Sequence, residues 1–297
     1  MRVQRFLASA WASVHGPADA RRLLLTILDA RFAGLGVSPG PRPIVCDALR
    51  EAARDLPIEF PVVRAGNPLA EHSPTASFAA AKASERQVAR AAIEVAVGQA
   101  RSLGCRTVVF DPGVVPLVGE IEAEDLGDPS YQWTHERTQA LLARRKAVRN
   151  AAVDRVCREL YELVRSHPDM EFCLTQSRSL RGVLDIAAMQ DIGEDLGHRR
   201  PGYWHDAALA ARRQQVLGEA QGEWLECFGN RCRGMTLGDA SPDGLYLPPG
   251  SGGVDYSLLA SYVPRTGAVL PIVLELDLAV PPGELPGMRS CLDKYGF

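Results

Sequence analysis

Four short segments in the last third of the chain decide the fold. They are Gly202-Tyr-Trp-His-Asp-Ala-Ala (202–208), Gly234-Met-Thr-Leu-Gly-Asp (234–239), Pro248-Pro-Gly-Ser-Gly-Gly-Val-Asp (248–255) and Val273-Leu-Glu-Leu (273–276). Three of them are short β-type runs that carry a polar side chain near their end, and 248–255 is a glycine-rich loop. Their spacing is that of successive βα units, which predicts a parallel sheet with polar groups at its strand ends.

The same alternation of short β-rich runs and longer helical periods extends back to the N-terminus. We expect strands at residues 6–13, 34–38, 59–64, 106–110, 171–175, 202–206, 233–237 and 270–276. We expect helices at 18–32, 44–55, 79–103, 135–166 and 184–196, two pieces between 209 and 228, then 255–263 and 284–295. Residues 114–133 are acidic and aperiodic, which is typical of a long binding loop or lid over the strand ends.

Eight βα units are the number that closes a parallel barrel. The 297 residues suffice for one such barrel of roughly 250 residues with extended loops, and no linker-like stretch divides them. We therefore expect a single (β/α)8 TIM-barrel domain over residues 1–297. An open doubly wound sheet is the weaker alternative, because its glycine-rich phosphate turn should follow the first strand, where Ser9-Ala-Trp-Ala-Ser-Val-His-Gly16 stands instead.

Composition excludes several classes of partner. The net charge of −3 gives no general attraction to a phosphate backbone, so we expect no nucleic-acid partner. No apolar run approaches the roughly 20 residues that span a bilayer, so we expect no membrane partner. The seven cysteines form no CxxC pair, which favours free thiols and a cytoplasmic location. The basic and apolar start of the chain is interpreted as the first strand and not as a signal peptide.

Barrel enzymes carry their working groups at the carboxyl ends of the strands. Applied to the expected strands, this rule gives a short set of candidate residues. They are Ser13, His15, Arg64, Asp111, Thr175, Gln176, His205, Asp206, Thr236, Asp239 and Glu275.

The four segments quoted above resemble the closing βα units of the xylose-isomerase-like TIM barrels, a superfamily of sugar isomerases, sugar epimerases and apurinic endonucleases. The loop 248–255 resembles the family's PGxGxxD loop between strand seven and its helix. The resemblance implies a divalent metal, Mn²⁺, Mg²⁺ or Zn²⁺, held by side chains at the ends of strands five to eight. Such an ion polarises a sugar carbonyl and stabilises an enediolate.

The resemblance carries over to only half of the metal-ligand set. Asp206 matches the strand-six aspartate and Glu275 matches the strand-eight glutamate. The strand-five glutamate falls on Thr175 or Gln176, and the strand-seven histidine falls on Thr236. The histidine that follows the strand-six aspartate falls on Leu209. Asp206 and Glu275 are therefore the expected ligands of a weak metal site, since two carboxylates can hold a hard ion together with water.

The remaining candidates have both a structural and a functional interpretation. His205 should face the helix layer, because successive strand residues point to opposite faces and Asp206 is expected to point inward. Asp111 begins an Asp-Pro-Gly turn and could also form a polar wall of the substrate pocket. Arg178 and Arg181 follow strand five, where one of them could bind an anionic substrate group.

These residues together suggest a sugar or sugar-phosphate isomerase or epimerase that moves a proton next to a carbonyl. Glu275 would be the general base or a metal ligand, and Asp206 a ligand or the partner acid. The expected substrate contacts are Asp111, Gln176, Arg178, Thr236 and Asp239. The alternative is a decayed barrel that binds a small molecule or regulates. An endonuclease is disfavoured, because it needs a histidine-rich zinc cluster and the chain has six histidines in all.

Overall fold

The barrel consists of eight parallel strands in the order β2-β1-β10-β7-β6-β5-β4-β3. The computed structural model describes residues 3–66, 77–119, 124–264 and 269–297. The strands are β1 (Val3–Ala8), β2 (Gly34–Gly36), β3 (Val63–Arg64), β4 (Thr107–Phe110), β5 (Glu171–Leu174), β6 (Gly202–Asp206), β7 (Cys232–Leu237) and β10 (Leu270–Leu274). Parallel bridges from Gly34 to Glu59 and from Val37 to Val63 join the two ends of the sheet. The expected (β/α)8 barrel is confirmed.

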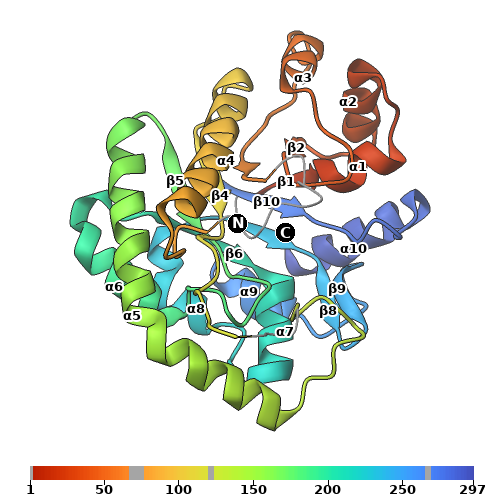
Figure 1. The fold of residues 1–297 in the computed structure, drawn as a ribbon. Coiled ribbons are helices and arrows are strands. Elements are labelled where there is room, and N and C mark those ends of the chain that lie inside the picture. The colour runs from red at the N-terminus through yellow and green to blue at the C-terminus, as the bar shows by residue number, and fades with distance from the viewer. Residues whose placement is uncertain (1–2, 67–76, 120–123, 265–268) are drawn as a thin grey trace.

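Helices form an outer layer around the strands (Figure 1). They are α1 (Ser9–His15), α2 (Ala20–Asp29), α3 (Cys46–Ala52), α4 (Ala83–Ser102), α5 (His135–Ser166), α6 (Ile186–Leu196), α7 (Ala207–Leu217), α8 (Glu223–Phe228), α9 (Tyr256–Ser261) and α10 (Leu285–Tyr295). Short 3-10 turns, η1 (Gly197–Arg199), η2 (Gly229–Arg231) and η3 (Pro282–Glu284), complete the connections. Among the described residues, no helix combines the length and the apolar composition needed to cross a bilayer.

Two expected elements differ from the structure. Residues 9–13 were expected to continue the first strand, but β1 ends at Ala8 and the next residues form α1. Trp11 in this helix is buried and donates a hydrogen bond from Nε1 to the Val280 carbonyl at 2.8 Å. The strand expected at 59–64 is reduced to Val63 and Arg64 in the sheet plus the bridge at Glu59. Pro61 lies between these points and lacks the backbone donor that a continuous ladder needs.

An antiparallel hairpin lies between β7 and α9 where the sequence suggested only a loop. Its strands are β8 (Asp239–Ser241) and β9 (Gly244–Leu247). The turn between them contains Pro242-Asp243, which is good turn chemistry, and a β-type run follows. This local signal could have predicted the hairpin, which brings Tyr246 to the mouth of the barrel.

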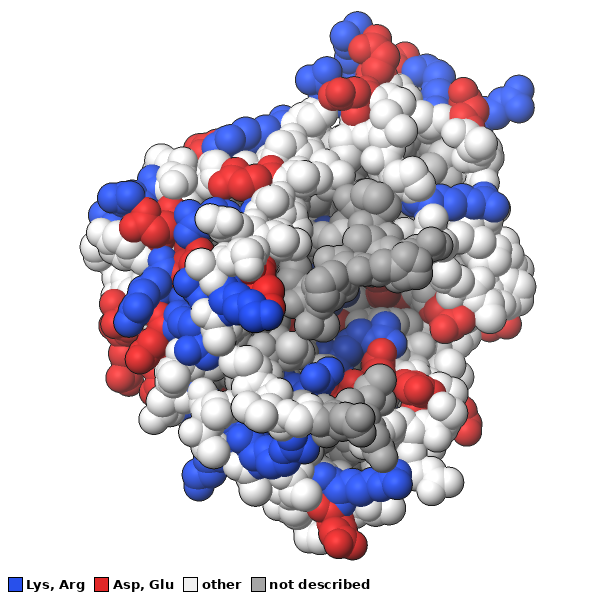
Figure 2. Space-filling model, in the orientation of Figure 1, with Lys and Arg blue, Asp and Glu red and all other residues white. Residues whose placement is uncertain are grey.

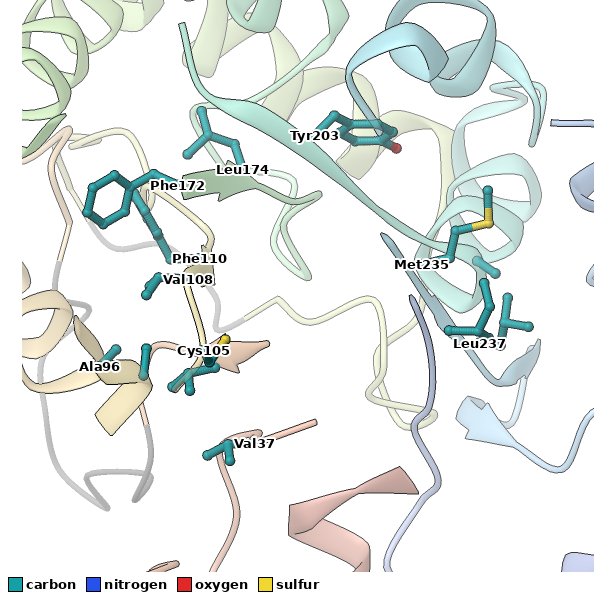
Figure 3. Packing of buried hydrophobic residues seen from close by; sticks show 14 of the residues in the cluster. Val37, Ala96, Cys105, Val108, Phe110, Phe172, Leu174, Tyr203, Met235 and Leu237 are labelled. Carbon is teal, nitrogen blue, oxygen red and sulfur yellow. The ribbon is translucent and has the colours of Figure 1, made fainter. Parts of the chain in front are cut away.

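Strand alternation separates two apolar layers. Side chains inside the barrel form one cluster: Phe6, Ala8, Val62, Val109, Cys173, Trp204 and Val273. Their strand neighbours face the helices and join the main core, as Figure 3 shows for Phe172, Tyr203, Met235 and other members. The same alternation directs Trp204 and Asp206 inward and Tyr203 and His205 outward.

Trp204 fills the barrel interior because the neighbouring strand carries a glycine beside it. A Cβ placed on Gly234 of β7 would lie 2.2 Å from Cζ3 of Trp204, closer than atoms can approach. The indole Nε1 donates to Thr236 Oγ1 at 2.9 Å, which satisfies the only polar atom of this ring. Gly234 is therefore required by packing inside the barrel.

We predict that Gly234→Ala destabilises the fold by at least ~1–3 kcal/mol, because the added methyl group overpacks the barrel interior. The matched control is Gly98→Ala in α4, where no heavy atom lies within 4 Å of the added Cβ. This control should gain about 0.5–1 kcal/mol, because alanine is the better helix former. Urea denaturation of both variants measures the difference, and a neutral Gly234→Ala would contradict the packing account.

Candidate functional site

A cavity of about 550 Å³ opens at the carboxyl ends of the barrel strands. Figure 2 shows a hollow near the middle of this face in which basic and acidic atoms lie together. Six of the expected residues line the cavity: Arg64, Asp111, Thr175, Gln176, Arg178 and Glu275. Further lining residues include Ala10, Pro39, Phe110, Ser177, Leu209, Tyr246 and Asp277. Residues from eight parts of the chain thus meet at one hollow, as the strand-end rule predicts.

Asp206 ends β6 and is fully buried beneath this cavity. Its Oδ1 accepts the backbone N–H of Leu209 at 3.1 Å and thereby caps α7. Its Oδ2 accepts the hydroxyl of Tyr246 at 2.9 Å and Nη2 of Arg64 at 3.1 Å. The Asp206 carboxylate does not line the cavity, so it acts on the site through the groups that it holds.

Arg64 lies between the two carboxylates that the sequence offered as metal ligands. Its guanidinium is 3.1 Å from Asp206 Oδ2 and 4.0 Å from Glu275 Oε2. Burial by itself would lower the pKa of Arg64, but Tyr246 and the two carboxylates raise it above its ordinary value. A fixed positive charge therefore stands at the floor of the cavity, with 19% of the Arg64 side chain exposed to it.

Glu275 directly follows β10 and is nearly buried, yet it lines the cavity. Burial raises its pKa to about 7, and the nearby Asp206 adds to this rise, while Arg64 opposes it. Among the described residues, Ser38 Oγ donates a long hydrogen bond of 3.5 Å to Glu275 Oε1. Glu275 therefore exchanges a proton near neutral pH, which suits a general acid or base.

Tyr246 reaches the site from the β8–β9 hairpin in a left-handed backbone conformation with φ of 60°. This conformation is costly for an aromatic residue and is retained at sites where the surrounding structure enforces it. Its carbonyl accepts the backbone N–H of Asp277 at 2.8 Å, which helps to hold the hairpin over β10. Burial and then Asp206 raise the pKa of Tyr246, so its phenol stays protonated and donates to Asp206.

Two buried polar atoms at the end of β5 lack a hydrogen-bond partner among the described residues. They are Oγ1 of Thr175 and Nε2 of Gln176, and both residues line the cavity. The other amide atom of Gln176, Oε1, accepts the backbone N–H of Asp206 at 2.9 Å. Because unpaired buried polar atoms are costly, these two are candidates for contact with a hydroxyl-bearing ligand.

Asp111 forms a turn and also belongs to the cavity wall. Its Oδ1 accepts the backbone N–H of Gly113 at 2.9 Å, as the Asp-Pro-Gly turn predicts. Solvent reaches its side chain from the open cavity, yet the surrounding protein raises the pKa of Asp111 by desolvation, while hydrogen bonds from Ser177 and Gly113 oppose the rise. The structural and the functional interpretation of this residue are therefore compatible.

The two arginines after β5 differ in position. Arg178 lines the cavity and pairs with Asp125, its Nη2 lying 3.0 Å from Oδ2. Arg181 lies outside the cavity lining and pairs with the buried Glu124 at 3.2 Å. Glu124 also accepts the backbone N–H groups of Leu180 and Arg181. Arg178 is therefore the one of the pair that can meet a ligand at the mouth.

Thr236, Asp239 and His205 also lie away from the cavity. Thr236 faces the barrel interior and accepts the hydrogen bond from Trp204. Asp239 is fully buried and accepts backbone N–H groups of Ala240, Gly250 and Val254, each at 2.9 Å, so it holds the glycine-rich loop 248–255 in place. His205 faces the helices as predicted: Tyr203 Oη lies 2.8 Å from its Nδ1, and burial lowers its pKa to about 3.

The donor set around Asp206 and Glu275 does not fit a divalent metal. In the part of the chain that the structure describes, no group of three or more histidine, cysteine, aspartate or glutamate side chains could hold an ion. The Asp206 oxygens already accept three donors, and the Arg64 guanidinium stands where an ion would have to bridge the two carboxylates. A second cation at this point would meet the charge of Arg64.

Sequence reasoning gave no role to three residues of this site. Arg64 was a strand-end candidate only, and Ser38 and Tyr246 were not candidates. Tyr246 required recognition of the hairpin, for which the Pro242-Asp243 turn was the available signal. The pairing of Arg64 with Asp206 spans 142 residues of sequence, and no local pattern encodes it.

We predict that Arg64→Gln lowers the free energy of unfolding by about 3–5 kcal/mol, because it leaves the buried Asp206 carboxylate without its cation. Adding Asp206→Asn to this variant should restore part of the loss, because the unpaired charge is then removed. Urea unfolding of the two single variants and the double variant measures the coupling. Strictly additive effects would show that the two groups do not interact.

We predict that Glu275→Gln removes a pH dependence of stability. The folded-state pKa of Glu275 is raised from 4.5 to about 7, so protonated Glu275 stabilises the native state below pH 4.5 and this contribution is lost as pH rises to about 7. Above that pH the ionised carboxylate costs about 3 kcal/mol, a cost that the neutral amide of the variant avoids. The variant should therefore exceed wild type in stability at pH 8 by up to this amount, with a smaller gap at pH 5. A gap independent of pH in thermal or urea unfolding would contradict the raised pKa.

The fold matches solved structures along nearly its whole length. A D-tagatose 3-epimerase-like protein aligns over 99% of this chain and 97% of its own, with a TM-score of 0.69 and 18% identity. The 3-keto-D-glucoside 4-epimerase from E. coli aligns over 99% and 100%, with a TM-score of 0.68 and 9% identity. A family 2 AP endonuclease from Brucella melitensis aligns over 99% of both chains, with a TM-score of 0.61 and 14% identity.

No family model matches the sequence, and no curated protein matches it significantly. Identities this low establish the architecture alone. The chain folds as a (β/α)8 TIM barrel, the architecture that it shares with these structures.

Proposed function

We propose that this protein is a sugar isomerase or epimerase that moves a proton next to a carbonyl, with Glu275 as the general base and Arg64 as the cationic partner. One observation carries the proposal: a carboxyl group with a pKa of about 7 lines an open cavity beside a fixed guanidinium. The sugar epimerases with the same fold, among them a D-psicose 3-epimerase with D-tagatose, support the substrate class.

The reaction follows from the positions of these two groups. Ionised Glu275 removes the proton from the carbon next to the carbonyl, and the C–H electron pair moves into an enediolate. The negative charge that develops on the carbonyl oxygen is stabilised by the Arg64 guanidinium, which is already oriented and needs no rearrangement. For isomerisation, protonated Glu275 returns the proton to the former carbonyl carbon, while the hydroxyl of the other carbon passes its proton to the enediolate oxygen and becomes the new carbonyl. Asp206, expected from the sequence to be catalytic, serves in this proposal to hold Arg64.

The positive charge in this proposal comes from Arg64 and not from an ion. The sequence resemblance implied Mn²⁺, Mg²⁺ or Zn²⁺ on Asp206 and Glu275. The hydrogen bonds of Asp206 and the proximity of Arg64 to both carboxylates support the arginine as their replacement. We therefore propose a metal-independent reaction.

The placement of Asp111 favours epimerisation over isomerisation. Asp111 follows β4 and Glu275 follows β10, and three strands separate β4 from β10 in either direction around the eight-stranded barrel. The two carboxyl groups therefore line opposite sides of one mouth. Inversion of a carbon requires one group to remove a proton from one face and a second group to deliver a proton to the other. Asp111, expected from the sequence to contact substrate, is proposed as this second group.

A polyhydroxylated substrate suits the remaining lining. Oγ1 of Thr175 and Nε2 of Gln176 can pair with sugar hydroxyls, which would relieve their unsatisfied state. Arg178 can donate hydrogen bonds to a further hydroxyl oxygen or to an anionic substituent at the rim. Thr236 and Asp239, the other expected substrate contacts, have internal hydrogen-bond partners and are not part of the proposed binding surface.

The test is exchange of sugar protons with solvent. Wild-type protein incubated with keto-hexoses in deuterated water should incorporate deuterium at a carbon next to the carbonyl. Glu275→Gln should slow this exchange by about 10²–10⁴-fold, because the base is lost. The rate should fall as pH drops below about 7, where Glu275 becomes protonated. Treatment with EDTA should leave the rate unchanged.

The matched control is Glu51→Gln, which removes an exposed carboxylate on α3 and should exchange like wild type. Asp111→Asn separates the two reaction types: it should block epimer formation while deuterium still exchanges through Glu275. Ketose binding without any exchange would instead favour the binding-protein alternative. Activity that disappears with EDTA and returns with Mn²⁺ would overturn the role of Arg64.

A further inference from the structure

A second cavity, of about 420 Å³, lies on the opposite face of the barrel from the proposed active site. It is lined by residues at the amino ends of β5, β6 and β7, together with parts of the preceding connections. The titratable lining residues are His198, Arg199, Arg200, Arg231, Arg233 and the single acid Glu171. The amino ends of barrel strands do not carry the chemistry of barrel enzymes, so this basic cleft needs a separate explanation.

The arginines of the basic cleft lack enough carboxylate partners. Glu171 pairs with Arg233. Within the described ranges, Arg199, Arg200 and Arg231 form no ion pair with any acidic side chain. By comparison, the buried Arg213 pairs with Glu219 at 2.7 Å. The cleft therefore holds an excess of positive charge in a concave space, which concentrates anions.

Partial burial and the neighbouring positive charges disfavour the protonated guanidinium of Arg231. Burial lowers its pKa, and the like charges of Arg200 and Arg233 lower it further. Its Nη1 is buried without a hydrogen-bond partner among the described residues and lies against α6, where a Cβ on Gly193 would be 3.0 Å away. A repelled and half-desolvated guanidinium destabilises the fold unless an anion compensates it.

Aromatic rings hold two of these cations in fixed positions. The guanidinium carbon of Arg231 lies 5.2 Å from the ring centroid of Phe228, and that of Arg199 lies 5.0 Å from the centroid of Tyr161. Cation–π contacts of this kind orient an arginine without neutralising it. These contacts orient two guanidinium groups of the cleft and leave their positive charge uncompensated.

We infer that the basic cleft binds a small phosphorylated molecule. The planar guanidinium fork matches phosphate oxygens in bidentate geometry, and several forks around one space suit a group with two or more negative charges. The volume is in the range of small-molecule sites. This site is independent of the proposed proton transfer, because it lies at the other end of the barrel.

Isothermal titration with inorganic phosphate and with pyrophosphate at constant ionic strength tests the inference. Wild-type protein should bind pyrophosphate saturably and more tightly than phosphate. Arg231→Gln and Arg200→Gln should each weaken binding by about tenfold or more, since each removes charge-assisted hydrogen bonds. Arg200 is exposed, so its variant remains informative if Arg231→Gln fails to fold.

Two controls locate the bound anion. Arg22→Gln removes an exposed arginine on α2 and should bind pyrophosphate like wild type, while Arg178→Gln reports any anion that is held at the cavity mouth. Binding that is lost in Arg178→Gln and kept in Arg200→Gln would place the anion at the mouth and overturn the inference. Absence of saturable binding to wild type would overturn it as well, and so would binding of a single-stranded oligonucleotide through these arginines without binding of pyrophosphate.

Discussion

The guanidinium of Arg64 between Asp206 and Glu275 is the interaction on which the site depends. It joins the carboxyl ends of β3, β6 and β10, three strands that are not neighbours in the barrel. Burial of three ionisable groups is tolerable only because they compensate one another. The balance is incomplete at Glu275, whose pKa of about 7 reflects burial that the arginine only partly offsets. Burial of these ionisable groups therefore costs folding free energy and also gives Glu275 a pKa at which it can exchange a proton.

The interior of the barrel supports this arrangement from below. Trp204 fills the space under the site, and Gly234 on the next strand makes room for its ring. From above, the β8–β9 hairpin holds Tyr246 against Asp206, and Asp239 fixes the adjoining glycine-rich loop through three backbone amides. Rigid contacts on both sides leave Arg64 and Glu275 little freedom, which is the preorganisation that electrostatic catalysis requires.

The two faces of the barrel distribute charge differently. At the carboxyl ends, Arg64 pairs with Asp206 and lies near Glu275, and Arg178 pairs with Asp125, so charges of both signs compensate one another around the cavity. At the amino ends of β5 to β7, arginines gather around one carboxylate, and the excess is left to an external anion in our inference. Arginine therefore serves as a fixed internal cation on one face, and in our inference it donates hydrogen bonds to a bound anion on the other face.

The sequence by itself determined the (β/α)8 architecture, the positions of most strands and helices, and the carboxylates at the ends of strands six and eight. These features follow from local periodicity and from residues that are adjacent in the chain, as in α5 and β6, whose expected ranges match the structure. Three contacts became known only from the tertiary structure. Arg64 lies between those carboxylates, Tyr246 donates a hydrogen bond to Asp206, and Asp239 accepts backbone N–H groups of the glycine-rich loop. Contacts between distant segments depend on side-chain direction and on the space left by neighbours such as Gly234. A local sequence pattern predicts neither of these.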